Sequence, residues 1–159
     1  MSEDAERAFI EDQLRRAVEG EAWHGPSVLE AMAMLDSARG CRVMTETGHS
    51  ACGITLHIAA WLEIVRERMR GTDVSPTAAQ DWPRVQGSPE AAWAAAGRRL
   101  LAAYDALVAA FRDMPPGALD AIVPGKMYDV RFMLHGVIQH TIYHAGQIAL
   151  AGRLTQGQD

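Results

Sequence analysis

The sequence predicts an all-α fold, and three observations lead to this prediction. Apolar residues recur at the three- and four-residue spacing of amphipathic helices along most of the 159-residue chain. Proline- and glycine-containing breaks separate these stretches. No stretch alternates apolar and polar residues between turn signals, as a strand would. We therefore expect a four-helix bundle with a short extra helix after the first, forming a single domain over residues 1–155 with a tail at 156–159.

The first long helix is expected at about residues 2–21. Its apolar stripe consists of Phe9, Ile10, Leu14, Ala17 and Val18. Gly25-Pro26 interrupts the pattern, and Ser27 with Glu30 has the spacing of a capping box. That pair predicts a short helix to about residue 35, followed by an irregular or briefly helical segment at 36–49.

The second long helix is expected at about residues 50–71. Residues 71–88 are rich in Thr, Ser, Pro, Asp and Gly, which indicates a long surface connection. A connection of that length can cross one end of a bundle and return the chain in the same direction.

The third long helix is expected to begin at Ser88-Pro89-Glu90, which combines a polar cap, proline at the first helical position and an acid in the first turn. Pro115-Pro116-Gly117 ends it. The fourth long helix is expected at about 129–153.

Composition and charge exclude several functions. The net charge is −5 and no basic stripe exists, so nothing favours nucleic acid as a partner. No apolar window approaches the 18 residues of a membrane span, and the acidic N-terminus does not resemble a secretory signal. The two cysteines, Cys41 and Cys52, form neither a CxxC motif nor a disulfide framework, which favours the cytoplasm.

Three histidines on apolar stripes are the candidate metal ligands. His140 and His144 are four residues apart and lie on one face of the fourth helix. His57 lies on the apolar stripe of the second helix, one turn before Trp61. Three imidazoles from two facing helices can bind one divalent ion and leave positions open for other ligands.

The alternative is that these histidines are core residues with satisfied hydrogen bonds. Each buried polar group without a partner costs about 1–3 kcal/mol, and Gln147 is the clearest polar partner on the same faces. Of the other histidines, His135 points elsewhere on its helix, His49 lies near a helix start where capping is expected, and His24 belongs to a loop that could fold over the bundle end.

Other residues are weaker candidates. Cys52 precedes His57 by five residues and points elsewhere on the helix, which argues against a Cys–His nucleophile pair. The four tryptophans are interpreted as packing residues. Tyr143 is interpreted as a core residue, with a place at the edge of a pocket as the alternative.

The chain resembles the DinB-like superfamily of four-helix-bundle metalloproteins over nearly its whole length. The resemblance is carried by Trp23-His24-Gly25-Pro26, by Leu56-His57-Ile58-Ala59-Ala60-Trp61, by Asp81-Trp82-Pro83 and most specifically by the segment from Leu134 to Ile148. It implies an up-down-down-up bundle, a homodimer, and nickel or zinc bound by His57, His140 and His144. Ile138 and Ile142, outside the main stripes, are candidates for the dimer interface.

The sequence departs from many relatives between His49 and His57, where Cys52 and Gly53 replace a tryptophan and a glutamate. Gly53 lies one turn before His57, so the pocket is expected to be wider or closed by another residue. Trp61, Tyr143, Gln147 and His24 are the remaining residues expected at or near the pocket.

The leading functional hypothesis is a metal-dependent enzyme that activates a low-molecular-weight thiol for S-transfer. The resemblance favours this chemistry, because characterised relatives include thiol-dependent transferases and isomerases. A metal-dependent hydrolase is the second hypothesis. A metal-binding stress-response protein without turnover is the third, and would use the same three ligands.

Overall fold

The computed structural model describes residues 2–43 and 48–155, and within these ranges it confirms the all-α prediction. The described residues form seven α-helices, one short 3-10 helix and no strand, apart from an isolated β-bridge between Ile122 and Asp129. The expected tail at 156–159 lies outside the described residues, as do residues 44–47 of the segment expected to be irregular.

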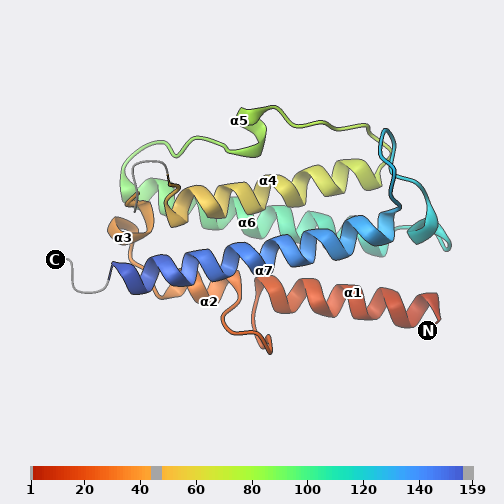
Figure 1. Cartoon of the computed structure of the whole chain (residues 1–159), viewed down its shortest axis with the longest axis horizontal. Helices are drawn as coiled ribbons and strands as arrows, with labels where there is room; N and C mark the ends of the chain where they lie inside the picture. Colours follow the sequence, from red (N-terminus) through yellow and green to blue (C-terminus); the bar gives the residue numbers. More distant parts are fainter. Residues whose placement is uncertain (1, 44–47, 156–159) are drawn as a thin grey trace.

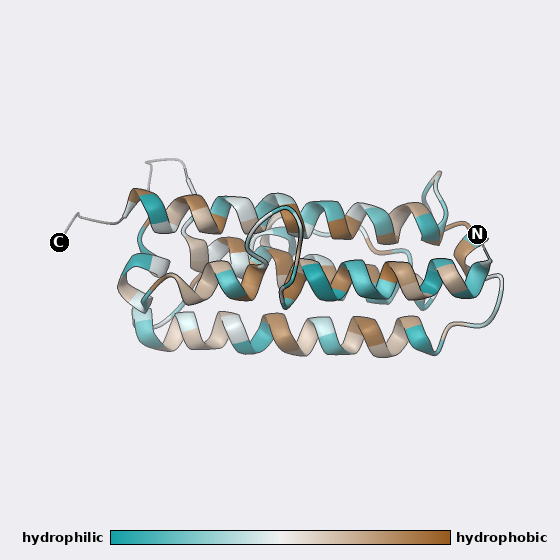
Figure 2. Ribbon diagram, turned by 90° about the horizontal axis from the view of Figure 1, so that it is seen from below, coloured by the Kyte–Doolittle hydropathy of each residue, from teal (hydrophilic) through white to brown (hydrophobic). Residues whose placement is uncertain are grey.

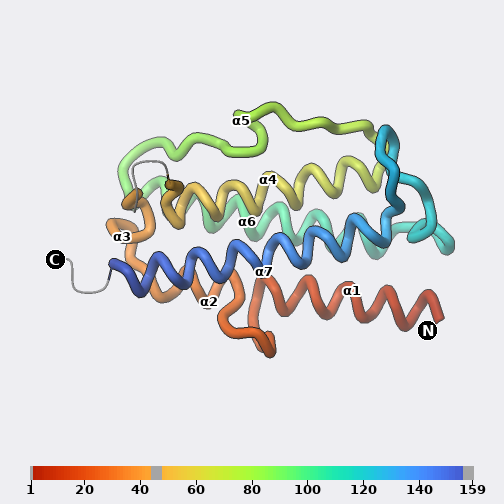
Figure 3. The backbone as a smooth tube through the Cα atoms, in the orientation of Figure 1, coloured from red at the N-terminus to blue at the C-terminus, as the bar shows by residue number. Residues whose placement is uncertain are grey.

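Four long helices lie side by side along the length of the molecule (Figures 1 and 2). They are α1 (Glu3–Val18), α4 (Ala51–Met69), α6 (Pro89–Arg112) and α7 (Val130–Leu154). α4 packs most extensively against α6 and α7, and α7 also packs against α1. The tube in Figure 3 shows α4 and α6 beginning at the same end of the molecule, while α7 begins at the other.

Short elements complete the described part of the chain. They are α2 (Val28–Ala33), α3 (Ser37–Cys41), α5 (Ala78–Asp81) and the 3-10 helix η1 (Ala118–Asp120). α2 packs on α7 and α3 packs on α6. α5 interrupts the segment that was expected to be a plain surface connection, and it contacts α4.

The predicted helix starts are present. Ser27 Oγ accepts a hydrogen bond from the Glu30 amide, and the Glu30 carboxylate accepts one from the Ser27 amide, as a capping box requires. Ser88 caps α6 and Pro89 follows at the first helical position. α1 ends earlier than expected because Gly20 has a φ of 146°, a conformation that glycine tolerates and a helix does not contain.

Most stripe residues are buried, and the exceptions are aromatic. Figure 2 shows apolar and polar residues mixed around each long helix, as in amphipathic helices. Phe9 was expected in the core but is 48% exposed. Trp23 was expected to pack but is fully exposed, because its loop projects from the bundle. Ile138, expected at a dimer interface, is buried in the core.

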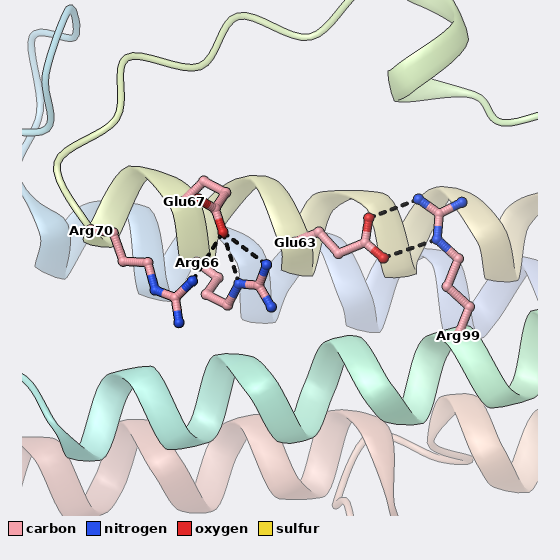
Figure 4. A network of polar contacts seen from close by, with 5 residues as sticks. All are labelled: Glu63, Arg66, Glu67, Arg70 and Arg99. Atoms are coloured by element: carbon pink, nitrogen blue, oxygen red, sulfur yellow. Dashed lines mark hydrogen bonds and ion pairs between the residues drawn. The ribbon is translucent and has the colours of Figure 1, made fainter.

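The charges of α4 that Figure 4 shows are largely paired. Glu63 accepts two hydrogen bonds from Arg99, at 2.9 and 2.7 Å, and so connects α4 to α6. Glu67 pairs with Arg66 and Arg70 on its own helix. None of the described helices is both long enough and apolar enough to cross a membrane.

Candidate metal centre

Three histidines converge between α4 and α7. The ligand atoms that His57, His140 and His144 can offer all lie within 4.8 Å of one another. His57 Nε2 and His140 Nε2 are 3.0 Å apart. His140 and His144 share a face because they are one turn apart, and the packing of α4 on α7 brings His57 to the same place. The sequence predicted this convergence.

Asp81 fixes the ring of His57. The Nδ1–H of His57 donates a hydrogen bond of 2.6 Å to the backbone carbonyl of Asp81. A carbonyl can only accept, so Nδ1 carries the proton and Nε2 presents its lone pair towards His140. The Asp81 carboxylate lies 3.2 Å from the same Nδ1 and also accepts a hydrogen bond from Trp61 Nε1.

Gln147 fixes the ring of His144 in the same way. The Nδ1–H of His144 donates to the side-chain oxygen of Gln147 at 2.6 Å, which leaves the His144 Nε2 lone pair free. The sequence predicted Gln147 near the pocket from its position on the same stripe. Among the described residues no group pairs with the buried His140 Nδ1. Because the unprotonated Nε2 of His57 can only accept across the 3.0 Å contact, His140 Nε2 is the donor and carries the proton of that ring in the absence of a metal.

A stacked arrangement of rings covers His57. Trp82 lies flat against His57, with ring centroids 3.8 Å apart and an interplanar angle of 6°. His49 stacks on Trp82 at 3.6 Å. His49 was expected to cap a helix, but Ser50 caps α4 instead. Trp82 and His49 therefore shield one face of the histidine cluster from water.

The three rings are held in the neutral form that binds metals. Burial is the main cause that lowers the pKa of His140 to about 4, and the neighbouring His144 and His57 contribute to the same shift. Burial likewise lowers the pKa of His57 and of His144. Deprotonated nitrogens are the ligand form, so protons compete little for these rings near neutral pH.

The geometry fits one divalent ion. Two nitrogens bound to a tetrahedral ion at about 2.0–2.1 Å lie about 3.3 Å apart. The Nε2 atoms of His57 and His140 are 3.0 Å apart, and the Nε2 lone pair of His144 is free. An ion bound by His57 and His140 would take the place of the proton that lies between their Nε2 atoms. Small movements of the rings would therefore accommodate an ion.

Two cavities lie beside the histidines. One has a volume of about 230 Å³ and is lined by Trp61 and His140, among others. The other has a volume of about 400 Å³ and is lined by Tyr143, His144 and Gln147, among others. Tyr143 is 64% exposed, so its interpretation as a core residue was wrong and the pocket-edge alternative describes it.

Several candidates lie away from the cluster. His24 is exposed and lines a separate cavity with Trp23 and Asp12, so its expected place at the pocket was wrong. His135 is half-buried and does not belong to the histidine group. A Cβ at Gly53 would lie 3.6 Å from Ser50 Oγ, so this glycine faces the start of its own helix and does not widen either cavity.

Sequence reasoning used Asp81-Trp82-Pro83 as a motif of the resemblance but assigned these residues no role at the site. Asp81 and Trp82 bring a carbonyl, a carboxylate and an indole ring to His57. The capping box of Thr77 and Gln80 could have predicted a short helix in this segment. That helix is α5, which ends at Asp81. It was overlooked because the connection is otherwise rich in turn-forming residues.

Comparison with known proteins identifies the family. A search of curated proteins and a search of solved structures found no match. The family model described as the DinB superfamily matches residues 11–148, which include all three histidines and the Asp81-Trp82 segment. The match covers most of the sequence and agrees with the helical fold. The chain therefore belongs to the DinB superfamily.

Proposed function

We propose that the chain binds one divalent metal ion through His57, His140 and His144 and activates a small thiol for S-transfer. The observation that carries the proposal is the convergence of three neutral imidazoles, two of them with tautomers fixed by Asp81 and Gln147. Three such ligands leave positions free for a substrate.

Nickel or zinc is the proposed metal, because imidazole nitrogens suit both ions. A bound divalent ion supplies Lewis acidity, which lowers the pKa of a thiol or water that reaches it. Asp81 and Gln147 fix the orientation of two rings by accepting hydrogen bonds from their Nδ1–H groups. Trp82 excludes water on one side, and the two cavities give a substrate room on the others.

Metal binding is tested with protein purified without an affinity tag. We expect elemental analysis to find about one divalent ion per chain, and calorimetry of stripped protein to show uptake of about one equivalent. His140→Ala should lose the ion, whereas His135→Ala should keep it. Equal loss in both variants, or no metal in the natural protein, would overturn the ligand assignment.

Thiol activation is tested in metal-loaded protein with a panel of cellular thiols and a model electrophile. We expect a thiol to perturb the spectrum of the cobalt-substituted site, and conjugation to exceed that of stripped protein. His57→Ala should abolish both effects. If no thiol perturbs the spectrum and no conjugation rate rises, the transferase proposal fails. Assays of ester and amide hydrolysis then test the hydrolase hypothesis. If these assays are also negative, the remaining hypothesis is a metal-binding protein without turnover.

The remaining proposals concern the setting of this site. We propose a four-helix bundle of up-down-down-up topology, supported by the course of the chain in Figure 1 and by family membership. We further propose a single domain over residues 1–155 and a homodimer. A cytoplasmic location is supported by the free thiols of Cys41 and Cys52.

A further inference from the structure

We infer that the 230 Å³ cavity beside His140 binds a small molecule with a carboxylate and an apolar body, and that Arg68 holds the carboxylate. The inference deepens the proposed function and rests on it, because this molecule would be the substrate that meets the activated thiol or water. It starts from Arg68, a residue of α4 that the proposed chemistry does not use.

Arg68 is a buried cation without an acidic partner. It is only 6% exposed, and no Asp or Glu of the described residues forms an ion pair with it. The neighbouring Arg66 and Arg70 differ, because both pair with Glu67 on the solvent side (Figure 4). Arg68 instead lies against the face of Trp61, with Cζ 5.6 Å from the ring centroid.

The hydrogen bonds of Arg68 leave donors unused on both terminal nitrogens. Nε and Nη2 donate to the carbonyl oxygen of Val74, and Nη1 donates to the hydroxyl of Tyr128. Each terminal nitrogen carries two N–H groups, so Nη1 and Nη2 each retain one. These remaining donors are available to the oxygens of a carboxylate.

A buried charge without a counter-ion is unfavourable, and an anionic ligand would relieve that cost. Val74 and Tyr128 offer neutral oxygens, which satisfy hydrogen bonds and do not neutralise the charge. The arrangement therefore orients the guanidinium while its charge remains uncompensated, which is suited to recognising an anion.

The walls of the cavity beside Arg68 suit the apolar part of such a ligand. Its walls are largely apolar or aromatic, and they include Trp61, Val65, Tyr128, Phe132, Met133 and Val137. No acidic residue lines it, and Arg68 is its one permanent charge among the described residues. Its volume lies below the usual range for drug-sized ligands, about 300–1,000 Å³, so the occupant is small.

The same cavity reaches the histidine cluster. His140 and Arg68 both line it, and Trp61 lies against both, with its ring centroid 5.6 Å from that of His140. A molecule anchored by Arg68 would therefore extend its apolar body towards His140. This places the carboxylate remote from the reacting end of the substrate.

The test uses 3-phenylpropionate as the probe and 3-phenylpropanamide as its neutral match. Binding is measured by calorimetry in zinc-loaded and in metal-stripped protein, with chemical-shift mapping of the contacted residues. We expect the carboxylate to bind on the order of tenfold or more tightly than the amide, because an ionised acceptor strengthens the hydrogen bonds of a guanidinium. The preference should persist in stripped protein, which excludes direct binding of the carboxylate to the metal.

Two variants address the site independently of each other. Arg68→Gln should remove the preference for the carboxylate. Since Arg68 also supports the 71–88 segment through Val74, Gly136→Leu provides a second route: its Cβ would meet no atom within 4 Å and the side chain would fill the cavity. Gly146→Leu is the matched control, because Gly146 lies on the same helix, has equally open space and lines neither cavity.

The outcomes separate this inference from the proposed function. Loss of binding in Gly136→Leu with retention in Gly146→Leu supports the inference. Equal binding of acid and amide, no binding to the natural protein, or retention in Gly136→Leu would overturn it, even if metal uptake and thiol conjugation are observed. Arg68-dependent binding in a protein that takes up no metal would instead contradict the proposed function alone.

Discussion

The side-chain amide of Gln147 is a small group on which the orientation of His144 depends. We expect Gln147→Leu to weaken metal affinity by about 10–100-fold, because an outer hydrogen bond that fixes a ligand ring has effects of that size. Calorimetric titration with zinc measures the change. Gln139→Leu makes the same substitution at an exposed position of α7 and should leave affinity unchanged; equal affinities in the two variants would contradict the role given to Gln147.

The buried thiol of Cys52 should make the free energy of unfolding depend on pH in alkaline solution. Burial raises the pKa of its thiol from 9.0 to about 12. The unfolded chain therefore loses this proton first, and the stabilising contribution, complete below about pH 9, is lost as the pH rises towards 12. Urea unfolding at several pH values measures it.

The control for that experiment is Cys52→Ala, which should reduce the decline in unfolding free energy over the same window. Burial also raises the pKa of Tyr104 to about 12, so part of the decline should remain in the variant. An unchanged pH dependence in Cys52→Ala would show that the thiol titrates alike in both states.

At the site, the spacing of residues along a helix predicted the side chains that share one helix face. It could not predict the residues that the long 71–88 connection places beside His57. His140, His144 and Gln147 follow from positions on a single stripe, and His57 follows from the stripe of the facing helix. Asp81 and Trp82 reach His57 through the path of residues 71–88, and His49 joins them by stacking on Trp82. Neither leaves a periodic pattern in the sequence.

At the scale of elements, the long helices were predicted because several local signals agreed. Ser88, Pro89 and the apolar stripe of α6 all indicate the same start, and the structure has it there. α5 was missed because four residues are too short for a stripe and none of them is buried. The end of α1 was predicted too late because the sequence does not show that Gly20 has a positive φ, which is incompatible with a helix.

α3 and α6 meet where Gly40 approaches the ring of Trp93. A Cβ at Gly40 would lie 2.8 Å from the indole of Trp93, closer than packed atoms permit. We expect Gly40→Ala to lower the free energy of unfolding by about 1–3 kcal/mol, as overpacking does. Gly146→Ala, in open space on α7, should raise it by about 0.5–1 kcal/mol through helix propensity. Chemical denaturation compares the two, and a neutral Gly40→Ala would mean that α3 moves freely.

For the whole molecule, the proposed homodimer retains one interface candidate. Ile142 lines a cavity beside Trp23, which is fully exposed. We expect sedimentation equilibrium at micromolar concentration to give about twice the 17.3 kDa chain mass. A monomer at that concentration would reject the dimer.

α5 links the candidate metal centre to the surface of the bundle. No residue of α5 is buried, yet the backbone carbonyl of its last residue, Asp81, accepts a hydrogen bond from His57 Nδ1. Brief local opening of this segment would release the His57 ring without unfolding the four long helices, so amide hydrogens near residues 77–82 should exchange with solvent faster than those of α4. Zinc would bind the closed form more tightly than the open form, so adding zinc should make opening rarer and slow the amide exchange. By linkage, zinc raises the free energy of opening by the same amount by which opening weakens the binding of zinc. The rates at which the site binds and releases an ion would then depend on how often residues 77–82 open.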